Sequence, residues 1–115
     1  MGGLRTHAHQ HHPISCETTI RGGGAVVLTL SGDLDSQGAS DIEPELRWAA
    51  TNADATVAVD CAALEEVDRA GLDALAQAGA LARDRHIAFQ LVSPSESVQK
   101  SILAAGLGGL LGIDD

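Results

Sequence analysis

Aromatic residues are scarce in this chain, whose 115 residues include one Trp, one Phe and no Tyr. Any core must therefore be built from its many Ala, Leu and Val side chains. Positive charge is scarce as well, with 7 Lys and Arg against 16 Asp and Glu and a net charge of −9. This balance opposes binding to nucleic acid or to an anionic membrane, because both need cationic contacts.

Long apolar runs are also missing, since no segment reaches the roughly 18 apolar residues of a membrane span. The segment Met1–Pro13 is polar and rich in histidine, without the apolar stretch of a signal peptide. We therefore expect a cytoplasmic protein that does not meet a membrane. A reducing compartment would keep the only two cysteines, Cys16 and Cys61, as thiols.

The length fits one domain with a single core. The composition predicts that residues 1–13 form a disordered arm and that residues 14–115 form the domain. Four histidines in the arm resemble a metal-binding tract. They have no Cys or carboxylate partner and no scaffold to fix their geometry, so we expect no metal site. Those histidines are His7, His9, His11 and His12.

The first half of the domain predicts a β-hairpin followed by a helix. Strands are expected at residues 14–20 and 25–30, joined by a turn at Gly22–Gly24. A phosphate loop is excluded there, because neither a helix nor a Gly-Lys-Ser/Thr sequence follows. A long loop should lead to a helix that Ser40 or Asp41 caps, with Pro44 in or next to its first turn. Trp48 is expected to pack along the edge of this helix, in preference to a role as an exposed partner-binding residue.

The second half alternates strands and helices. Strands are expected at residues 56–59 and 86–92, and a short last one at 110–113. Asp68 is expected to cap a helix that ends near residues 83–85, and a further helix should run from Pro94 to Gly106. The alternation predicts an α/β domain with a mixed sheet of about five strands, mostly parallel with the first antiparallel, and about three helices.

Enzymatic motifs are absent, and we expect neither catalysis nor a cofactor. There is no Gly-x-Ser-x-Gly sequence and no His in a recognisable frame with Ser or Cys. Asp33, Asp35 and Asp60 imitate part of the acidic set of a phosphoreceiver domain. The acidic pair follows the wrong strand for that fold, and the only Lys, Lys100, falls in a predicted helix.

The stretch Asp60–Leu75 carries the most specific pattern in the chain. It resembles the signature of the STAS domain, the fold of bacterial anti-sigma factor antagonists, and matches it at Asp60, Asp68, Gly71, Leu72, Ala74 and Leu75. Two further segments extend the resemblance to about residues 14–113. They are Ser31-Gly32-Asp33-Leu34-Asp35 and Leu91-Val92-Ser93-Pro94, the latter followed by Ala105-Gly106-Leu107.

The resemblance implies a protein-binding module that sequesters an anti-sigma factor of the ATP-binding serine kinase type. The kinase in that family phosphorylates a serine and so breaks the complex. Here Ala70 replaces the phosphoacceptor and has no hydroxyl group. The residues that the resemblance places at the partner-binding surface are Asp33, Asp35, Ser36, Asp68, Arg69, Ala70, Gly71 and Leu72.

Three outcomes remain open from the sequence. The chain is a constitutive antagonist, or a STAS module that acts as a sensor, ligand-binding or assembly subunit, or an antagonist regulated through another residue. Ser36, Ser40 and Cys61 are the candidates for that last role. The sequence identifies neither the sigma factor nor the oligomeric state.

Overall fold

The structure is a computed structural model that describes residues 13–112. Residues 1–12 and 113–115 lie outside the described part, and the expected N-terminal arm lies almost entirely among them. The elements are β1 (Ser15–Arg21), a 3₁₀ turn η2 (Gly22–Gly24), β2 (Ala25–Leu34), α1 (Ser36–Asn52), β3 (Thr56–Val67), α2 (Arg69–Asp84), β4 (Ala88–Val92) and α3 (Glu96–Ala104).

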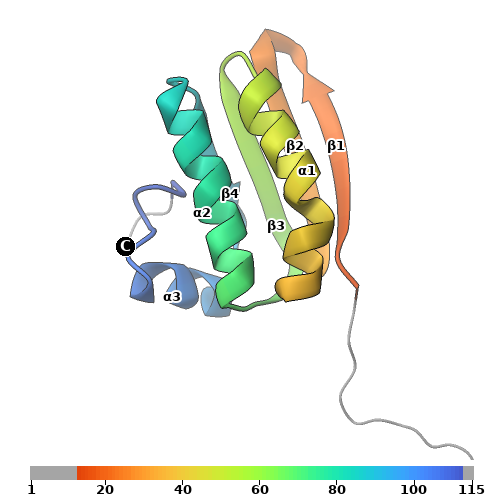
Figure 1. The fold of residues 1–115 in the computed structure, drawn as a ribbon, viewed down its shortest axis with the longest axis vertical. Helices are drawn as coiled ribbons and strands as arrows, with labels where there is room; N and C mark the ends of the chain where they lie inside the picture. Colours follow the sequence, from red (N-terminus) through yellow and green to blue (C-terminus); the bar gives the residue numbers. More distant parts are fainter. Residues whose placement is uncertain (1–12, 113–115) are drawn as a thin grey trace, which may run out of the picture.

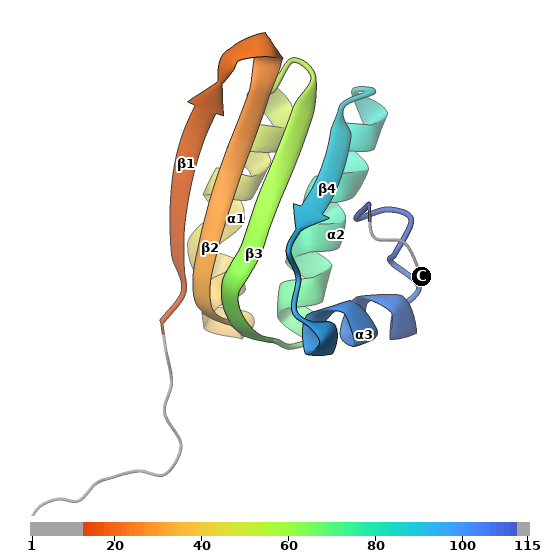
Figure 2. The ribbon, with the colours of Figure 1, turned by 180° about the vertical axis from the view of Figure 1, so that it is seen from behind.

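The four strands form one mixed sheet in the order β1-β2-β3-β4, which confirms the expected α/β class. The first pair is antiparallel, and the other two pairs are parallel. The connections from β2 to β3 and from β3 to β4 both move in the same direction along the sheet. Because such crossovers are right-handed, their helices lie on the same face of the sheet. Accordingly α1 and α2 cover the same face, and no helix of residues 13–112 covers the opposite face of the sheet (Figures 1 and 2).

The continuous apolar run at residues 25–30 favours a strand that is buried on both faces, but burial along β2 alternates between its two faces. Val26, Leu28 and Leu30 are at most 4% exposed beneath the helices. Val27 and Thr29 point to the open face and are only half-buried. The core is aliphatic as expected, and Phe89 is its one aromatic residue.

Helix α1 begins five residues before the expected cap, which is a second correction. Asp35 is the N-cap, so neither Ser40 nor Asp41 starts the helix and no long loop precedes it. Pro44 therefore lies inside the helix, where it leaves the Ser40 carbonyl without its usual amide donor. Both residues are exposed, so water can satisfy that carbonyl.

Strand β3 continues to Val67, whereas the sequence suggested a loop after Val59. It pairs with β2 to the last residue of both strands, across two register shifts that each place one extra residue in β3. These irregularities are β-bulges, which bend a strand and raise its twist. Cys61 consequently lies within β3 and not in a loop after it.

The expected strand start at His86 is also wrong, because His86 ends α2 instead. Its φ is 60°, its N–H bonds to the Arg83 carbonyl at 2.9 Å, and the Ile87 N–H bonds to the Ala82 carbonyl at 2.8 Å. This pair of bonds is a Schellman motif with histidine in the position that glycine usually takes. Strand β4 therefore begins at Ala88.

The expected last strand is a turn over residues 110–112; Ile113 lies outside the described residues. The Leu111 side chain is completely buried, and its carbonyl accepts a 3.0 Å hydrogen bond from the Leu91 amide of β4. This segment thus covers the outer edge of β4 without becoming a strand.

Candidate functional site

Two helix starts lie next to each other at the carboxyl ends of β2 and β3. In the parallel register Leu34 is opposite Val67, so the residues that follow, Asp35 and Asp68, begin neighbouring helices. The Asp68 amide also donates to the Leu34 carbonyl at 3.1 Å. Because paired strands are only about 4.8 Å apart, the first turns of α1 and α2 lie side by side at the same end of the sheet.

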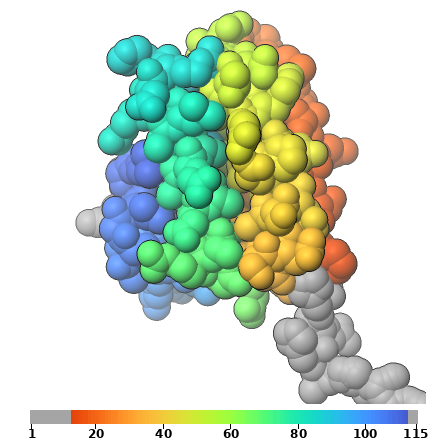
Figure 3. Space-filling model, viewed as in Figure 1, coloured from red at the N-terminus to blue at the C-terminus, as the bar shows by residue number. Residues whose placement is uncertain are grey.

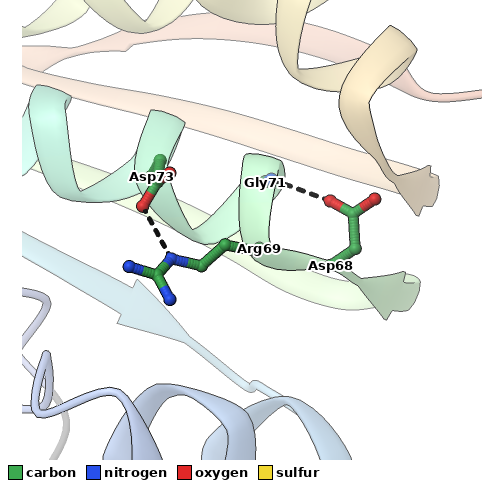
Figure 4. Close-up of polar contacts among 4 residues, drawn as sticks. All are labelled: Asp68, Arg69, Gly71 and Asp73. Carbon is green, nitrogen blue, oxygen red and sulfur yellow. Dashed lines mark hydrogen bonds and ion pairs between the residues drawn. The ribbon is translucent and has the colours of Figure 1, made fainter.

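Each helix start is capped in the same way. Oδ1 of Asp35 accepts a 2.8 Å hydrogen bond from the Gly38 amide, and Oδ1 of Asp68 accepts a 3.0 Å bond from the Gly71 amide (Figure 4). The prediction that Asp68 caps the central helix is confirmed. Both caps satisfy an amide that has no partner inside the helix and place a carboxylate near the positive end of the helix dipole.

Gly71 lets α2 approach the end of β2 closely. A Cβ at this position would lie 2.3 Å from the carbonyl oxygen of Leu34, which is too close for any side chain. Gly71 and its neighbour Leu72 are both buried. These two residues therefore position the predicted surface and do not form part of it.

Arg69 and Ala70 occupy the first turn of α2 with different surroundings. Arg69 is exposed and its Nε is 3.2 Å from Oδ1 of Asp73, one turn further along the helix (Figure 4). Ala70 is half-buried, and its side chain lines a surface pocket between α1 and α2. A group attached at position 70 would therefore face α1 as well as solvent.

A groove separates α1 from α2 and extends from Ala70 along both helices (Figure 3). It consists of two adjoining hollows of about 300 Å³ and 180 Å³. This groove was not predicted from the sequence. Ala70, Ala74 and Ala78 recur every four residues on α2, and such small side chains along one stripe were the available signal. The groove residues are Ala39, Ser40, Glu43, Leu46, Arg47, Ala70, Asp73, Ala74, Gln77, Ala78 and Leu81.

Acidic residues surround the paired helix starts. Asp33 and Glu66 are opposite each other in the register of β2 and β3, and Asp35 and Asp68 follow at the caps. Ser36 is exposed at the first position of α1. Of the eight residues predicted for the binding surface, the fold therefore brings Asp33, Asp35, Ser36, Asp68, Arg69 and Ala70 to one end of the molecule.

The cysteines are poorly suited to regulation. Cys61 is completely buried, and burial, together with the nearby negative charge of Asp60, raises its pKa to about 12. Burial and the charge of Glu45 raise the pKa of Cys16 to about 11, although a hydrogen bond with Thr18 lowers it somewhat. Both therefore stay protonated near neutral pH, and the buried thiol of Cys61 is inaccessible to reagents.

Within residues 13–112, no group of three or more His, Cys, Asp or Glu side chains could hold a metal ion. The histidines of the N-terminal arm lie outside this range. Over the same described range, no helix combines the length and the apolar character needed to cross a membrane.

Comparison with solved structures supports the fold. Similar structures include SpoIIAA of Bacillus, an anti-sigma factor antagonist in its unphosphorylated form, with a TM-score of 0.73 and 20% identity over 88% of this chain and 89% of that chain. An anti-sigma factor antagonist from Mycobacterium paratuberculosis gives a TM-score of 0.72 and 19% identity over 87% and 84% of the two chains. The murine solute carrier 26 anion transporter, member A9, gives a TM-score of 0.65 and 18% identity. The match covers 87% of this chain and 19% of that chain.

Comparison by sequence supplies the family. No curated protein matches the chain. The family model described as "Mlab, STAS domain" matches residues 18–112, which is most of the chain. The protein therefore belongs to the STAS domain family.

Proposed function

We propose that this protein is a binding module that sequesters an anti-sigma factor of the ATP-binding serine kinase type. The observation that carries the proposal is the pair of capped helix starts at one end of the sheet. The STAS resemblance aligns Ala70, in the first turn of α2, with the family's phosphoacceptor. Three solved structures with the same fold bear the description of anti-sigma factor antagonist. No cofactor is needed for this role.

The proposed contact surface combines the acidic rim with the groove between α1 and α2. Asp33, Asp35, Ser36, Asp68 and Arg69 form the rim, and Ala70 begins the groove. A partner that fits this surface carries cationic side chains for the rim, since complementary charge steers association and favours the correct partner. It also carries small apolar side chains for the groove.

Ala70 makes this module insensitive to the phosphorylation that releases the family's antagonists. A methyl group cannot accept the γ-phosphoryl group of ATP, so the complex persists in the presence of active kinase. If another residue takes over the regulation, the structure favours Ser36 or Ser40, which are both exposed. Cys61 is disfavoured because it is buried.

Titration calorimetry with a kinase-type anti-sigma factor from the same host tests the proposal. Ala70→Asp adds a charge that the partner would bury beside Asp68, so we expect binding to weaken by about 1–3 kcal/mol. Gln37→Asp is the matched control, because Gln37 occupies the same position in the first turn of α1 and is exposed. We expect a smaller loss for this variant. Equal affinities for the wild type and Ala70→Asp would place the interface elsewhere.

Ala70→Ser tests the missing switch directly. The new hydroxyl group lies in the first turn of α2, where helix amides favour a phosphate group. We expect the kinase and ATP to add one phosphate to this variant and none at position 70 of the wild type, as measured by mass spectrometry. Arg69 already pairs with Asp73, so the new phosphate has to compete with that carboxylate for the guanidinium group.

A second candidate is a STAS module that acts as a sensor, ligand-binding or assembly subunit without sigma-factor control. It is favoured by the similarity to a segment that makes up 19% of an anion transporter, in which this fold is one part of a larger protein. A pull-down with the host's kinase-type anti-sigma factors separates the two candidates. Failure of every such kinase to bind the wild type would favour the second.

A further inference from the structure

The two edges of the sheet differ in how they are covered. The outer edge of β4 is covered by the segment around Leu111, whose carbonyl bonds to the Leu91 amide. Strand β1 is the other edge, and no described element lies beyond it (Figure 2). An uncovered edge strand presents backbone amides and carbonyls that can pair with another strand.

The exposed large hydrophobic residues of the described chain lie at this same edge. Ile20 of β1 is 70% exposed and Trp48 of α1 is 42% exposed. Trp48 lines a surface hollow of about 340 Å³ together with Thr18, Pro44 and Glu45. Thr18 and Ile20 are opposite the buried residues Leu28 and Val26, so both point to the helix-covered face of the sheet.

The charges of β1 are arranged on the other face. Glu17 and Arg21 point to the open face of the sheet, opposite Thr29 and Ala25 of β2. They are four residues apart on a strand, which is about 13 Å and too far for a direct ion pair. No ion pair within residues 13–112 involves either of them.

A second copy of β1 complements this arrangement. In an antiparallel pair centred on Thr19, Glu17 of each strand is directly opposite Arg21 of the other, at a Cβ distance of about 5 Å. The same register places Ile20 opposite Thr18 of the other copy, next to the hollow that Trp48 lines. One register thus provides partners for both charges and covers both exposed hydrophobic side chains.

Other registers are less favourable. Centring the pair on Glu17 or on Arg21 brings like charges directly together. Centring it on Thr18 or Ile20 leaves both charges without an opposite partner. A shift by one residue would place the helices of the two copies on opposite faces of the sheet and separate Ile20 from the Trp48 hollow.

We propose that the protein forms a symmetric dimer through antiparallel pairing of its two β1 strands, centred on Thr19. The two sheets join into one continuous sheet, with the helices of both copies on the same face. Glu17 and Arg21 form two ion pairs across the two-fold axis, and Ile20 of each copy packs against Trp48 of the other. The contact is one strand wide, so its affinity is expected at the weak end of the range for protein dimers. The dimer does not depend on the proposed partner.

Sedimentation equilibrium of the full chain, up to ~1 mM, tests this dimer. We expect a monomer–dimer equilibrium. Glu17→Arg and Arg21→Glu should each weaken it by about tenfold or more, because each variant replaces two attractive pairs with two repulsive ones. The double variant Glu17→Arg/Arg21→Glu reverses both charges and should restore the wild-type affinity. Glu66→Arg makes the same charge change away from β1 and should have no effect.

Trp48 supplies an independent signal, because it is the only Trp in the chain. Its emission should shift to shorter wavelength as the wild type dimerises, and should not change with concentration in Glu17→Arg. Three results would overturn the proposal: a wild type that stays monomeric at ~1 mM, a dimer that both single variants leave intact, or a double variant that fails to recover. A dimer that forms without any change in Trp48 emission would also exclude this interface.

Discussion

The starts of α1 and α2 are two versions of one local structure. Each follows a strand of the parallel pair and begins with an Asp cap. In each, the cap accepts a hydrogen bond from the amide of a glycine three residues later. They differ in how tightly they pack. A Cβ at Gly71 would be 2.3 Å from a backbone oxygen of β2, whereas one at Gly38 would be 2.8 Å from the Asp33 carbonyl oxygen.

This difference shows what each start does in the fold. The start of α2 is pressed against the end of the neighbouring strand β2, and the Asp68 amide bonds to Leu34 there. The start of α1 packs against the end of its own strand and against Ile14. The α2 start therefore holds β2 and β3 in register at the candidate site. The α1 start instead stabilises the connection between β2 and α1.

Replacement of the two glycines should reveal the largest difference in stability between the two helix starts. In Gly71→Ala the new methyl group meets backbone atoms that cannot move independently, so we expect a loss of about 2–3 kcal/mol in unfolding free energy. In Gly38→Ala the smaller overlap is partly offset by the better helix propensity of Ala, and we expect a loss of about 1 kcal/mol. Urea unfolding of both variants measures the difference.

Gly109→Ala is the control for these variants, because a Cβ there would meet nothing within 4 Å. We expect its urea midpoint to stay close to that of the wild type. If Gly38→Ala were as damaging as Gly71→Ala, the distinction between the two helix starts would be lost.

Removal of the caps should lower the stability by a smaller amount, which is similar for the two helix starts. Asp35→Ala and Asp68→Ala each leave one helix amide without its acceptor, and we expect each to cost about 1 kcal/mol. Asp68→Asn keeps an oxygen that accepts the same hydrogen bond and should retain most of the stability. Thermal unfolding of the three variants checks this, and a cost for Asp68→Asn equal to that of Asp68→Ala would contradict the role of the cap.

The smallest effect on stability is expected for replacement of Arg69. The equivalent position in α1 is occupied by Ser36, which carries no charge. Its ion pair with Asp73 is exposed, and such pairs along a helix contribute about 0.3–0.5 kcal/mol. Arg69→Ala should therefore change the unfolding free energy by no more than that, and the change should shrink in high salt. A larger loss would mean that Arg69 contributes to the fold through contacts other than Asp73.

The comparison also explains why one helix start was predicted and the other was not. Asp68 stands before a helical pattern that contains no proline. Asp35 precedes Gly38 and Pro44, two residues that disfavour a helix interior. The close approach of Gly38 to Asp33 makes glycine useful there, and Pro44 is tolerated on an exposed side of the helix. Neither compensation is visible in the order of residues.

The sequence by itself determined the α/β class, the antiparallel first hairpin, the parallel pairs that follow, the aliphatic core and the cap of α2. These features depend on local patterns and on the handedness of crossovers, which neighbouring residues encode. Tertiary structure decided the length of β3, the residue that starts α1, the turn over residues 110–112 and the groove between the helices. Each of these depends on contacts between residues that are distant in the chain, where the packing of one element against another overrides local preference.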